Sequence, residues 1–172
     1  MDEFPMFYKF MGAGQFCRFP KAVLEDDPYP VRALIVVGGS PMLTFPDAKR
    51  WREVYRKLDC LIVSDRYPTE DSRYADVVFP SCTLFETYKP VPGPDGKIEL
   101  MEPAIAPVGE CRDDVLILSG IAKKLGVGDD YPDNVDELKT WLCDSLPPYA
   151  GDFGSGQKKP ERIYKKYQTG NL

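Results

Sequence analysis

The stretch RALIVVGGSP, residues 32–41, joins an unbroken apolar run to a turn that contains glycine. Apolar residues that follow one another without polar alternation are typical of a strand covered on both faces in a parallel sheet. Gly38-Gly39-Ser40-Pro41 ends the run, because glycine and proline interrupt regular structure. Residues 32–37 are therefore predicted to form a buried strand that opens an α/β fold.

A helix and a second strand are predicted after this turn. Thr44 and Asp47 fit a capping box, and proline is tolerated in the first turn of a helix. Apolar residues then recur at helical spacing, namely Ala48, Trp51, Val54, Tyr55 and Leu58. Residues 60–64 predict the next strand, which ends at Asp65. The pattern indicates a strand–helix–strand unit.

The rest of the chain supplies further elements of an open sheet. They are predicted as a strand at 75–79 closed by Pro80, an edge strand or hairpin arm at 97–101, a helix from Asp113 to Gly126, and a helix after the capping box of Asn134 and Glu137. We therefore predict an α/β fold with a Rossmann-like, open, mainly parallel sheet and helices on both faces.

Three segments are expected along the chain. Residues 1–30 are interpreted as an irregular aromatic segment with a short helix near 19–24, and residues 31–148 as the α/β domain. Residues 149–172 are polar and rich in glycine, lysine and tyrosine, so we expect a flexible tail or linker to a missing C-terminal domain.

Composition excludes several classes of function. The 172 residues carry 22 Lys and Arg against 27 Asp and Glu, a formal charge of -5. This acidic balance opposes nucleic-acid binding, which needs a basic surface. No apolar run approaches the ~18 residues of a membrane helix, and no signal-like segment opens the chain. We expect a soluble domain without membrane insertion. The sequence leaves open whether the parent protein is cytoplasmic or periplasmic.

Histidine is absent, which removes the commonest acid–base residue and zinc ligand. The five cysteines are scattered singly, and none forms the C-x-x-C spacing of a metal, iron–sulfur or redox motif. They are interpreted as small buried residues or idle thiols, so no metal ligand and no catalytic residue is predicted. Glu86 and Glu110 are interpreted as acids that are solvated or paired with lysine or arginine.

Two turns are the candidate binding site. Gly38, Gly39, Ser40 and Pro41 follow one strand, where glycines let a phosphate approach backbone N–H groups and a serine hydroxyl could donate to phosphate or ribose. Taken alone, the sequence favours an ordinary tight turn over a binding site, and the G-x-G-x-x-G fingerprint of NAD binding is missing.

The second turn begins with Asp65, at the end of the second strand. Its carboxylate could accept hydrogen bonds from ribose hydroxyls or from the N–H edge of guanine, with Thr69 as a second contact and Tyr67 against the base or sugar. A strand-end aspartate that caps a turn is the alternative interpretation.

Taken in order, these segments resemble the molybdopterin oxidoreductase superfamily typified by dimethyl sulfoxide reductase. The matching residues are VVGGSP ending at Pro41, SDRYPTE ending at Glu70, ADVVFP ending at Pro80, Glu86, and the passage 97–110 before a helix ending Leu125-Gly126. The likeness covers roughly residues 20–126 and is nearest to the polysulfide/thiosulfate reductase and acetylene hydratase branches. Ser40 departs from the asparagine usual in the family.

The resemblance implies the third domain of a catalytic subunit, which holds one of two molybdopterin guanine dinucleotides of a bis cofactor with molybdenum or tungsten. It implies that Gly39 and Ser40 face phosphate or ribose and that Asp65 bonds the guanine, with Thr69 nearby. Iron–sulfur and metal-ligating segments have no counterpart, so the isolated fragment is expected to perform no redox turnover. Its partners would be the remaining domains of the subunit and electron-transfer subunits.

Two other functions stay open. The chain could be a free-standing nucleotide-binding or regulatory module with a flavodoxin-like sheet, or a structural domain that has lost its ligand. A preference for guanine that depends on Asp65 would favour the cofactor-binding interpretation.

Overall fold

The computed structural model describes residues 15–145, and these fall in two compact units. The first ends at Ser81 and the second begins at Cys82. The tail or linker expected at 149–172 lies outside the described residues, as do the first fourteen residues of the expected irregular segment.

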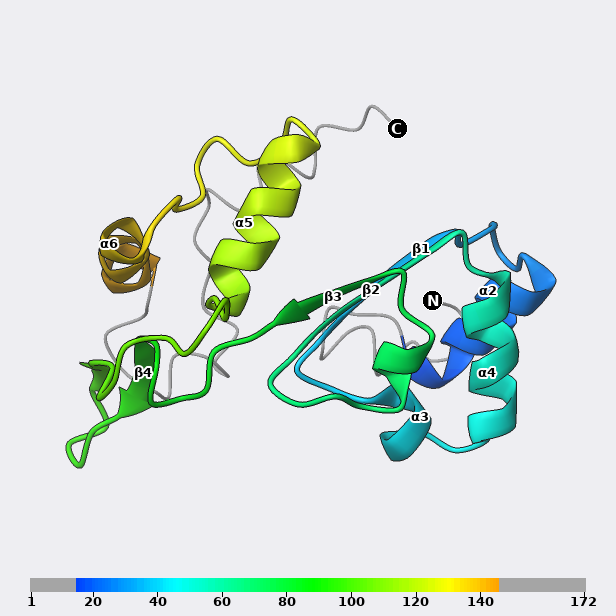
Figure 1. Cartoon of the computed structure of the whole chain (residues 1–172), viewed down its shortest axis with the longest axis horizontal. Coiled ribbons are helices and arrows are strands. Elements are labelled where there is room, and N and C mark those ends of the chain that lie inside the picture. Colours follow the sequence, from blue (N-terminus) through cyan, green and yellow to red (C-terminus); the bar gives the residue numbers. More distant parts are fainter. Residues whose placement is uncertain (1–14, 146–172) are drawn as a thin grey trace. The chain divides into compact units, whose positions relative to one another are not determined.

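The first unit alternates helices with parallel strands (Figure 1). Its elements are η1 (Phe16–Arg18), α2 (Phe19–Glu25), β1 (Ala33–Val37), α3 (Pro41–Thr44), α4 (Ala48–Lys57), β2 (Cys60–Asp65), η2 (Asp71–Arg73) and β3 (Val77–Pro80). The strands form one sheet in the order β1-β2-β3, and both neighbouring pairs run parallel. The predicted open, mainly parallel α/β fold is confirmed, and so is the short helix near residues 19–24.

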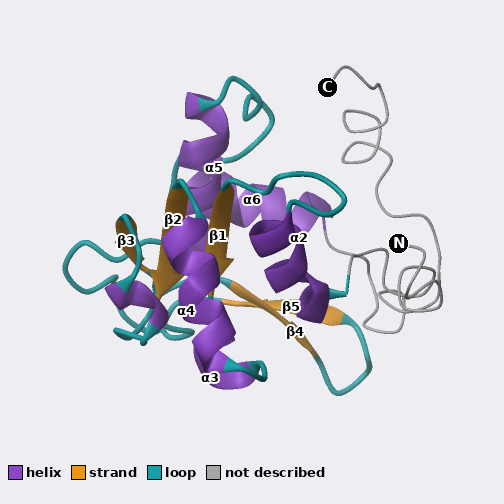
Figure 2. Ribbon diagram, turned by 90° about the vertical axis from the view of Figure 1, so that its right-hand side faces the viewer, coloured by secondary structure: helices purple, strands orange, loops and turns teal. Residues whose placement is uncertain are grey.

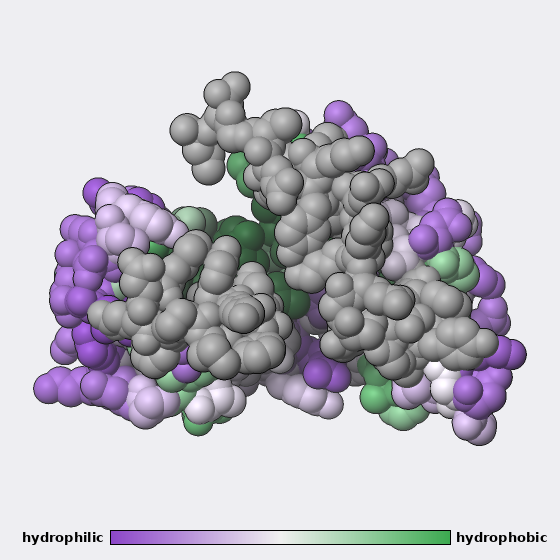
Figure 3. Space-filling view, turned by 180° about the vertical axis from the view of Figure 1, so that it is seen from behind, coloured by the Kyte–Doolittle hydropathy of each residue, from purple (hydrophilic) through white to green (hydrophobic). Residues whose placement is uncertain are grey.

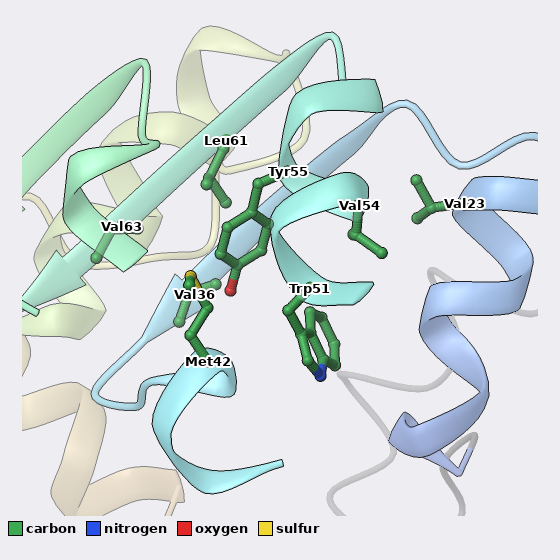
Figure 4. Packing of buried hydrophobic residues seen from close by; sticks show 8 residues of the cluster. All are labelled: Val23, Val36, Met42, Trp51, Val54, Tyr55, Leu61 and Val63. Atoms are coloured by element: carbon green, nitrogen blue, oxygen red, sulfur yellow. The ribbon is translucent and has the colours of Figure 1, made fainter. Parts of the chain in front are cut away.

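A hydrophobic core joins α4 to one face of this sheet. Trp51, Val54 and Tyr55 recur on one side of α4 and are at most 4% exposed. They pack with strand residues Val36, Leu61 and Val63, and with Val23 and Met42 from α2 and α3. Figure 4 shows Val54 and Val23 pointing toward one another, where α4 and α2 lie side by side. Burying several such side chains stabilises the unit, because each contributes about 1.5–3 kcal/mol by leaving water.

The opposite face of the sheet is only partly covered. Ile35 and Val37 alternate with buried Val36 and are 40% and 39% exposed, and Val77 on β3 is 41% exposed. Hydrophobic residues are visible on the surface in the rear view of Figure 3. The sequence pattern predicted cover on both faces of β1, and within the first unit the densest packing lies on the face toward α4.

The predicted start of α4 is wrong by three residues, because the N-cap is Asp47 rather than Thr44. Thr44 does not cap this helix but ends α3, where its hydroxyl donates to the Ser40 carbonyl at 2.8 Å. The N-cap of α4 is Asp47, whose carboxylate accepts from the Arg50 amide at 3.1 Å. The reason is local. Pro41 already begins a short helix directly after the glycine turn, and once that helix has ended the next helix needs an N-cap of its own.

The second unit contains an antiparallel hairpin and two helices (Figure 2). These are β4 (Lys89–Pro92), β5 (Ile98–Met101), α5 (Asp114–Lys124) and α6 (Val135–Ser145). The predicted hairpin arm is confirmed, as are the caps, because Asp113 accepts from the Val115 amide and Asn134 from the Glu137 amide. Among residues 15–145, no helix has both the length and the apolar character needed to cross a membrane.

Candidate functional site

The two predicted turns leave the same edge of the sheet. Val37 and Ser64 are neighbours in the parallel register of β1 and β2, so both strands end side by side. The Gly38 amide continues this ladder by donating to the Ser64 carbonyl at 2.9 Å. The structure therefore brings the glycine turn and Asp65 together at the carboxyl edge, where open parallel sheets bind their ligands.

The glycine turn presents open backbone at this edge. Gly38 has a φ of 59°, a left-handed conformation that glycine adopts without strain. A Cβ atom added to Gly39 would meet only the Val37 carbonyl oxygen, at 3.9 Å. Within residues 15–145, the amides of Gly39 and Ser40 donate no hydrogen bond. Consecutive unused amides in a turn can hold an anionic group.

Asp65 uses one of its two carboxylate oxygens to shape its own turn. Oδ1 accepts from the Arg66 amide at 2.7 Å and from the Tyr67 amide at 3.3 Å, so the turn-capping interpretation is confirmed. In the described part of the chain no hydrogen bond reaches Oδ2. Tyr67 is 71% exposed. Oδ1 thus fixes the position of the carboxylate through the turn.

Thr69 has a buried hydroxyl at this edge of the sheet. Its Oγ1 is the one buried side-chain oxygen or nitrogen among the described residues that makes no hydrogen bond. The threonine lies between Asp65 and the short helix η2. An unsatisfied buried hydroxyl is costly, about 1–3 kcal/mol, unless a ligand or water completes it.

Ser40 and Pro41 are buried and turn inward. The Ser40 hydroxyl donates to the carboxylate of Asp71, which is fully buried in η2. The same carboxylate accepts from the Met42 amide at 3.2 Å and from the Tyr55 hydroxyl. Of the Ser40 groups considered for ligand binding, the hydroxyl is engaged with Asp71, whereas the backbone amide donates no hydrogen bond within residues 15–145.

Asp71 was not predicted from sequence. It lies in a polar run without periodicity, where an aspartate normally indicates a solvated turn. Burial, followed by the hydrogen bond to Asp71, raises the pKa of Tyr55 well above its usual value of 10.0. Tyr55 therefore stays protonated and keeps donating. The network ties the glycine turn, α4 and η2 together behind the site.

Glu86 also differs from its prediction. It is buried rather than solvated, and its carboxylate accepts from the amides of Thr83 and Val108 at 2.7 and 2.8 Å. Hydrogen bonds from the Thr83 side chain and backbone, and then from the Val108 backbone, lower the pKa of Glu86 to about 2. Glu86 thus joins two loops of the second unit by accepting hydrogen bonds from their backbone amides. A single glutamate in the sequence gives no signal of such a role.

The fold is that of open parallel α/β domains, which take ligands at the carboxyl ends of their strands. Residues 19–124 match the model of the molybdopterin oxidoreductase family, and the chain belongs to this family. The family resemblance of the sequence is thereby confirmed. Membership implies a molybdopterin cofactor with molybdenum or tungsten.

Two curated relatives illustrate the family. The chain is 28% identical over 130 residues to an F420-dependent formate dehydrogenase subunit alpha of Methanocaldococcus jannaschii, covering 75% of this chain and 19% of the relative. It is 29% identical over 128 residues to a thiosulfate reductase molybdopterin-containing subunit of Salmonella typhimurium, covering 73% of this chain and 17% of the relative. The nearest branch within the family stays a prediction.

A solved structure has a similar fold. Acetylene hydratase from Pelobacter acetylenicus superposes with a TM-score of 0.62 at 19% sequence identity, covering 85% of this chain and 19% of that one. The chain thus spans less than a fifth of the length of each of these three proteins.

Proposed function

We propose that this chain binds one molybdopterin guanine dinucleotide through its diphosphate and guanine, as a domain of a molybdenum or tungsten oxidoreductase. The observation that carries the proposal is the carboxyl edge of the sheet, where the glycine turn and Asp65 leave neighbouring strands. Among residues 15–145, the amides of Gly39 and Ser40 and the Oδ2 atom of Asp65 make no hydrogen bond there. When bound, the pterin and its metal supply the oxidation–reduction chemistry. We propose no catalytic residue on this chain and no turnover by the chain alone.

Each group fits one part of the ligand. The amides of Gly39 and Ser40 are donors, which suits phosphate oxygens. Guanine offers N–H donors on its base-pairing edge, which a carboxylate oxygen accepts, whereas adenine offers a different pattern there. The buried Thr69 hydroxyl is an orphaned polar group that a ribose or base atom could complete. Exposed Tyr67 has a ring available to lie against the base or sugar.

Further domains of the same catalytic subunit, together with electron-transfer subunits, are the proposed partners. The small part of each relative that this chain covers supports these partners. The chain covers 19% and 17% of the length of two proteins named as enzyme subunits. The rest of such a subunit would hold the metal and the remainder of the cofactor.

Nucleotide titration tests the proposal directly. We expect GDP to shift the amide resonances of Gly39 and Ser40 in an NMR titration and to bind more tightly than ADP. Asp65→Asn should keep the Oδ1 contact to the Arg66 amide but replace the free acceptor oxygen with a donor. Losing a hydrogen bond to a charged group costs about 1.5–3 kcal/mol, so the preference for GDP should fall by about tenfold or more.

Asp59→Asn is the matched control. Asp59 is exposed and directly precedes the first residue of β2, at the end of the strand opposite Asp65. It should leave the GDP preference unchanged. Equal binding of GDP and ADP by the unaltered chain, or a preference that survives Asp65→Asn, would contradict the proposed guanine contact.

A further inference from the structure

Two cysteines of the second unit lie together although they are 29 positions apart in the chain. The sulfur atoms of Cys82 and Cys111 are 3.7 Å apart. Backbone contact fixes this approach, since the Cys82 amide donates to the carbonyl of Arg112, the residue after Cys111, at 2.9 Å. This main-chain hydrogen bond holds the two cysteine segments next to each other.

Glu86 supports the same arrangement. Its carboxylate accepts from the Thr83 amide, beside Cys82, and from the Val108 amide, in the loop that leads to Cys111. The Cys111 thiol also donates to Oε1 of Glu86 at 3.5 Å. A single buried carboxylate thus links both cysteine segments. Among the described residues no group of three or more cysteine and acidic side chains is placed to hold a metal ion.

A cavity gives small molecules access to the pair. It has a volume of about 330 Å³, and its lining includes Cys82, Glu86, Ala104, Pro107, Cys111 and Leu116. Cys111 is partly exposed, whereas Cys82 is 6% exposed. Burial, followed by the hydrogen bond to Cys111, raises the pKa of the Cys82 thiol to about 12. Because Cys111 is the more exposed of the two, it is the thiol that an incoming reagent meets first.

We propose that Cys82 and Cys111 form a reversible dithiol–disulfide pair that is oxidised by small-molecule disulfides of the glutathione type. The sulfurs have to move from 3.7 Å to about 2.05 Å, which side-chain rotation and small loop adjustment supply. The two cysteines belong to the second unit, whereas the glycine turn and Asp65 belong to the first.

The exchange takes place in two balanced steps. Cys111 loses its proton to solvent and attacks one sulfur of the small disulfide, whose S–S bond breaks. The departing half leaves as a thiolate and takes a proton from solvent. Cys82 then loses its proton and attacks the Cys111 sulfur, and the second small thiol leaves in the same way. Two protein thiols are oxidised to one disulfide, while one small disulfide is reduced to two thiols.

Disulfide mapping tests this pair in the full chain. The protein is incubated in glutathione buffers of increasing oxidised fraction, remaining thiols are blocked, and peptides are identified by mass spectrometry without reduction. We expect Cys82–Cys111 to be the first intramolecular disulfide to form, and dithiothreitol to reverse it. Oxidation in denaturant should lose this selectivity, because the five cysteines then pair according to loop length rather than folded proximity.

Variants locate the two steps. Cys82→Ser should stop the reaction at a mixed disulfide on Cys111, whereas Cys143→Ser, which changes an exposed cysteine on α6, should leave the Cys82–Cys111 yield unchanged. The proposal is overturned if the unaltered folded chain keeps both thiols reduced while its other cysteines are oxidised, or if Cys82–Cys111 forms no faster in the folded chain than in denaturant.

Discussion

The hydroxyl of Ser40 donates a hydrogen bond to the buried carboxylate of Asp71, 31 residues further along the chain. Ser40 follows β1 and Asp71 follows β2, so the bond connects the two loops that leave the carboxyl edge of the sheet. Asp71 also accepts from the Met42 amide, at the start of α3. The position of the glycine turn therefore depends on an aspartate that would itself touch no ligand.

Asp71→Asn should destabilise the chain strongly. The asparagine amide group would face donors at a place where the carboxylate accepts three hydrogen bonds, leaving at least one buried donor unpaired. We expect a loss of about 2–3 kcal/mol in the free energy of unfolding, measured by urea denaturation. Asp59→Asn, at an exposed ion pair, should change it by less than about 0.5 kcal/mol. Similar values for both variants would show that the network adds no stability.

Tyr55→Phe separates the hydroxyl from the packing of its ring. The ring stays in the core while the bond to Asp71 is lost, so the expected cost is about 1–2 kcal/mol near neutral pH. Because the folded protein raises the pKa of Tyr55 above 10.0, its contribution is fully present below pH 10 and is lost as the pH rises beyond that value.

Alkaline denaturation measures this pH dependence. Urea midpoints of the unaltered chain and Tyr55→Phe should converge as the pH is raised past 10, since tyrosines elsewhere are common to both. A difference that stays constant or grows with pH would contradict the assignment to Tyr55.

Glu86→Gln should remove a contribution that depends on pH in the acid range. The pKa of Glu86 is lowered from 4.5 to about 2 in the folded chain, so its stabilising effect is present above pH 4.5 and disappears as the pH falls toward 2. The unaltered chain should be more stable than Glu86→Gln at pH 6, and the difference should shrink between pH 4.5 and 2. Glu110→Gln, at an exposed glutamate of the same unit, serves as control in the same urea titrations.

Elements set by local pattern could be predicted from the sequence. The apolar run of β1 and the capping residues Asp113 and Asn134 act on their own neighbours, and each lies where it was expected. Thr44 shows the limit of the same rule. Thr44 and Asp47 can both cap a helix, and in the structure it is Asp47 that caps α4.

Long-range pairing explains what the sequence could not show. Asp71 binds residues 16 to 31 positions away, and Cys82 meets Cys111 across 29 positions. Neither contact leaves a periodic or motif signal, because each depends on how strands and loops are brought together. For the candidate site, parallel pairing placed Gly38 and Asp65 at one edge, as the strand order implied, whereas the engagement of the Ser40 hydroxyl by Asp71 required the structure.

Alanine substitutions at the two neighbouring glycines should separate folding from ligand binding. Gly38 has a φ of 59°, so Gly38→Ala should cost about 1–2 kcal/mol of stability through left-handed strain. Gly39 has ordinary room for a Cβ atom, with its nearest contact at 3.9 Å, so Gly39→Ala should leave the urea midpoint nearly unchanged. The new methyl group would nevertheless stand beside the unused amides, and GDP binding in the NMR titration should weaken. If Gly39→Ala binds GDP as tightly as the unaltered chain does, the proposed close contact between phosphate and this turn is wrong. This conclusion holds whatever the stability of the variant.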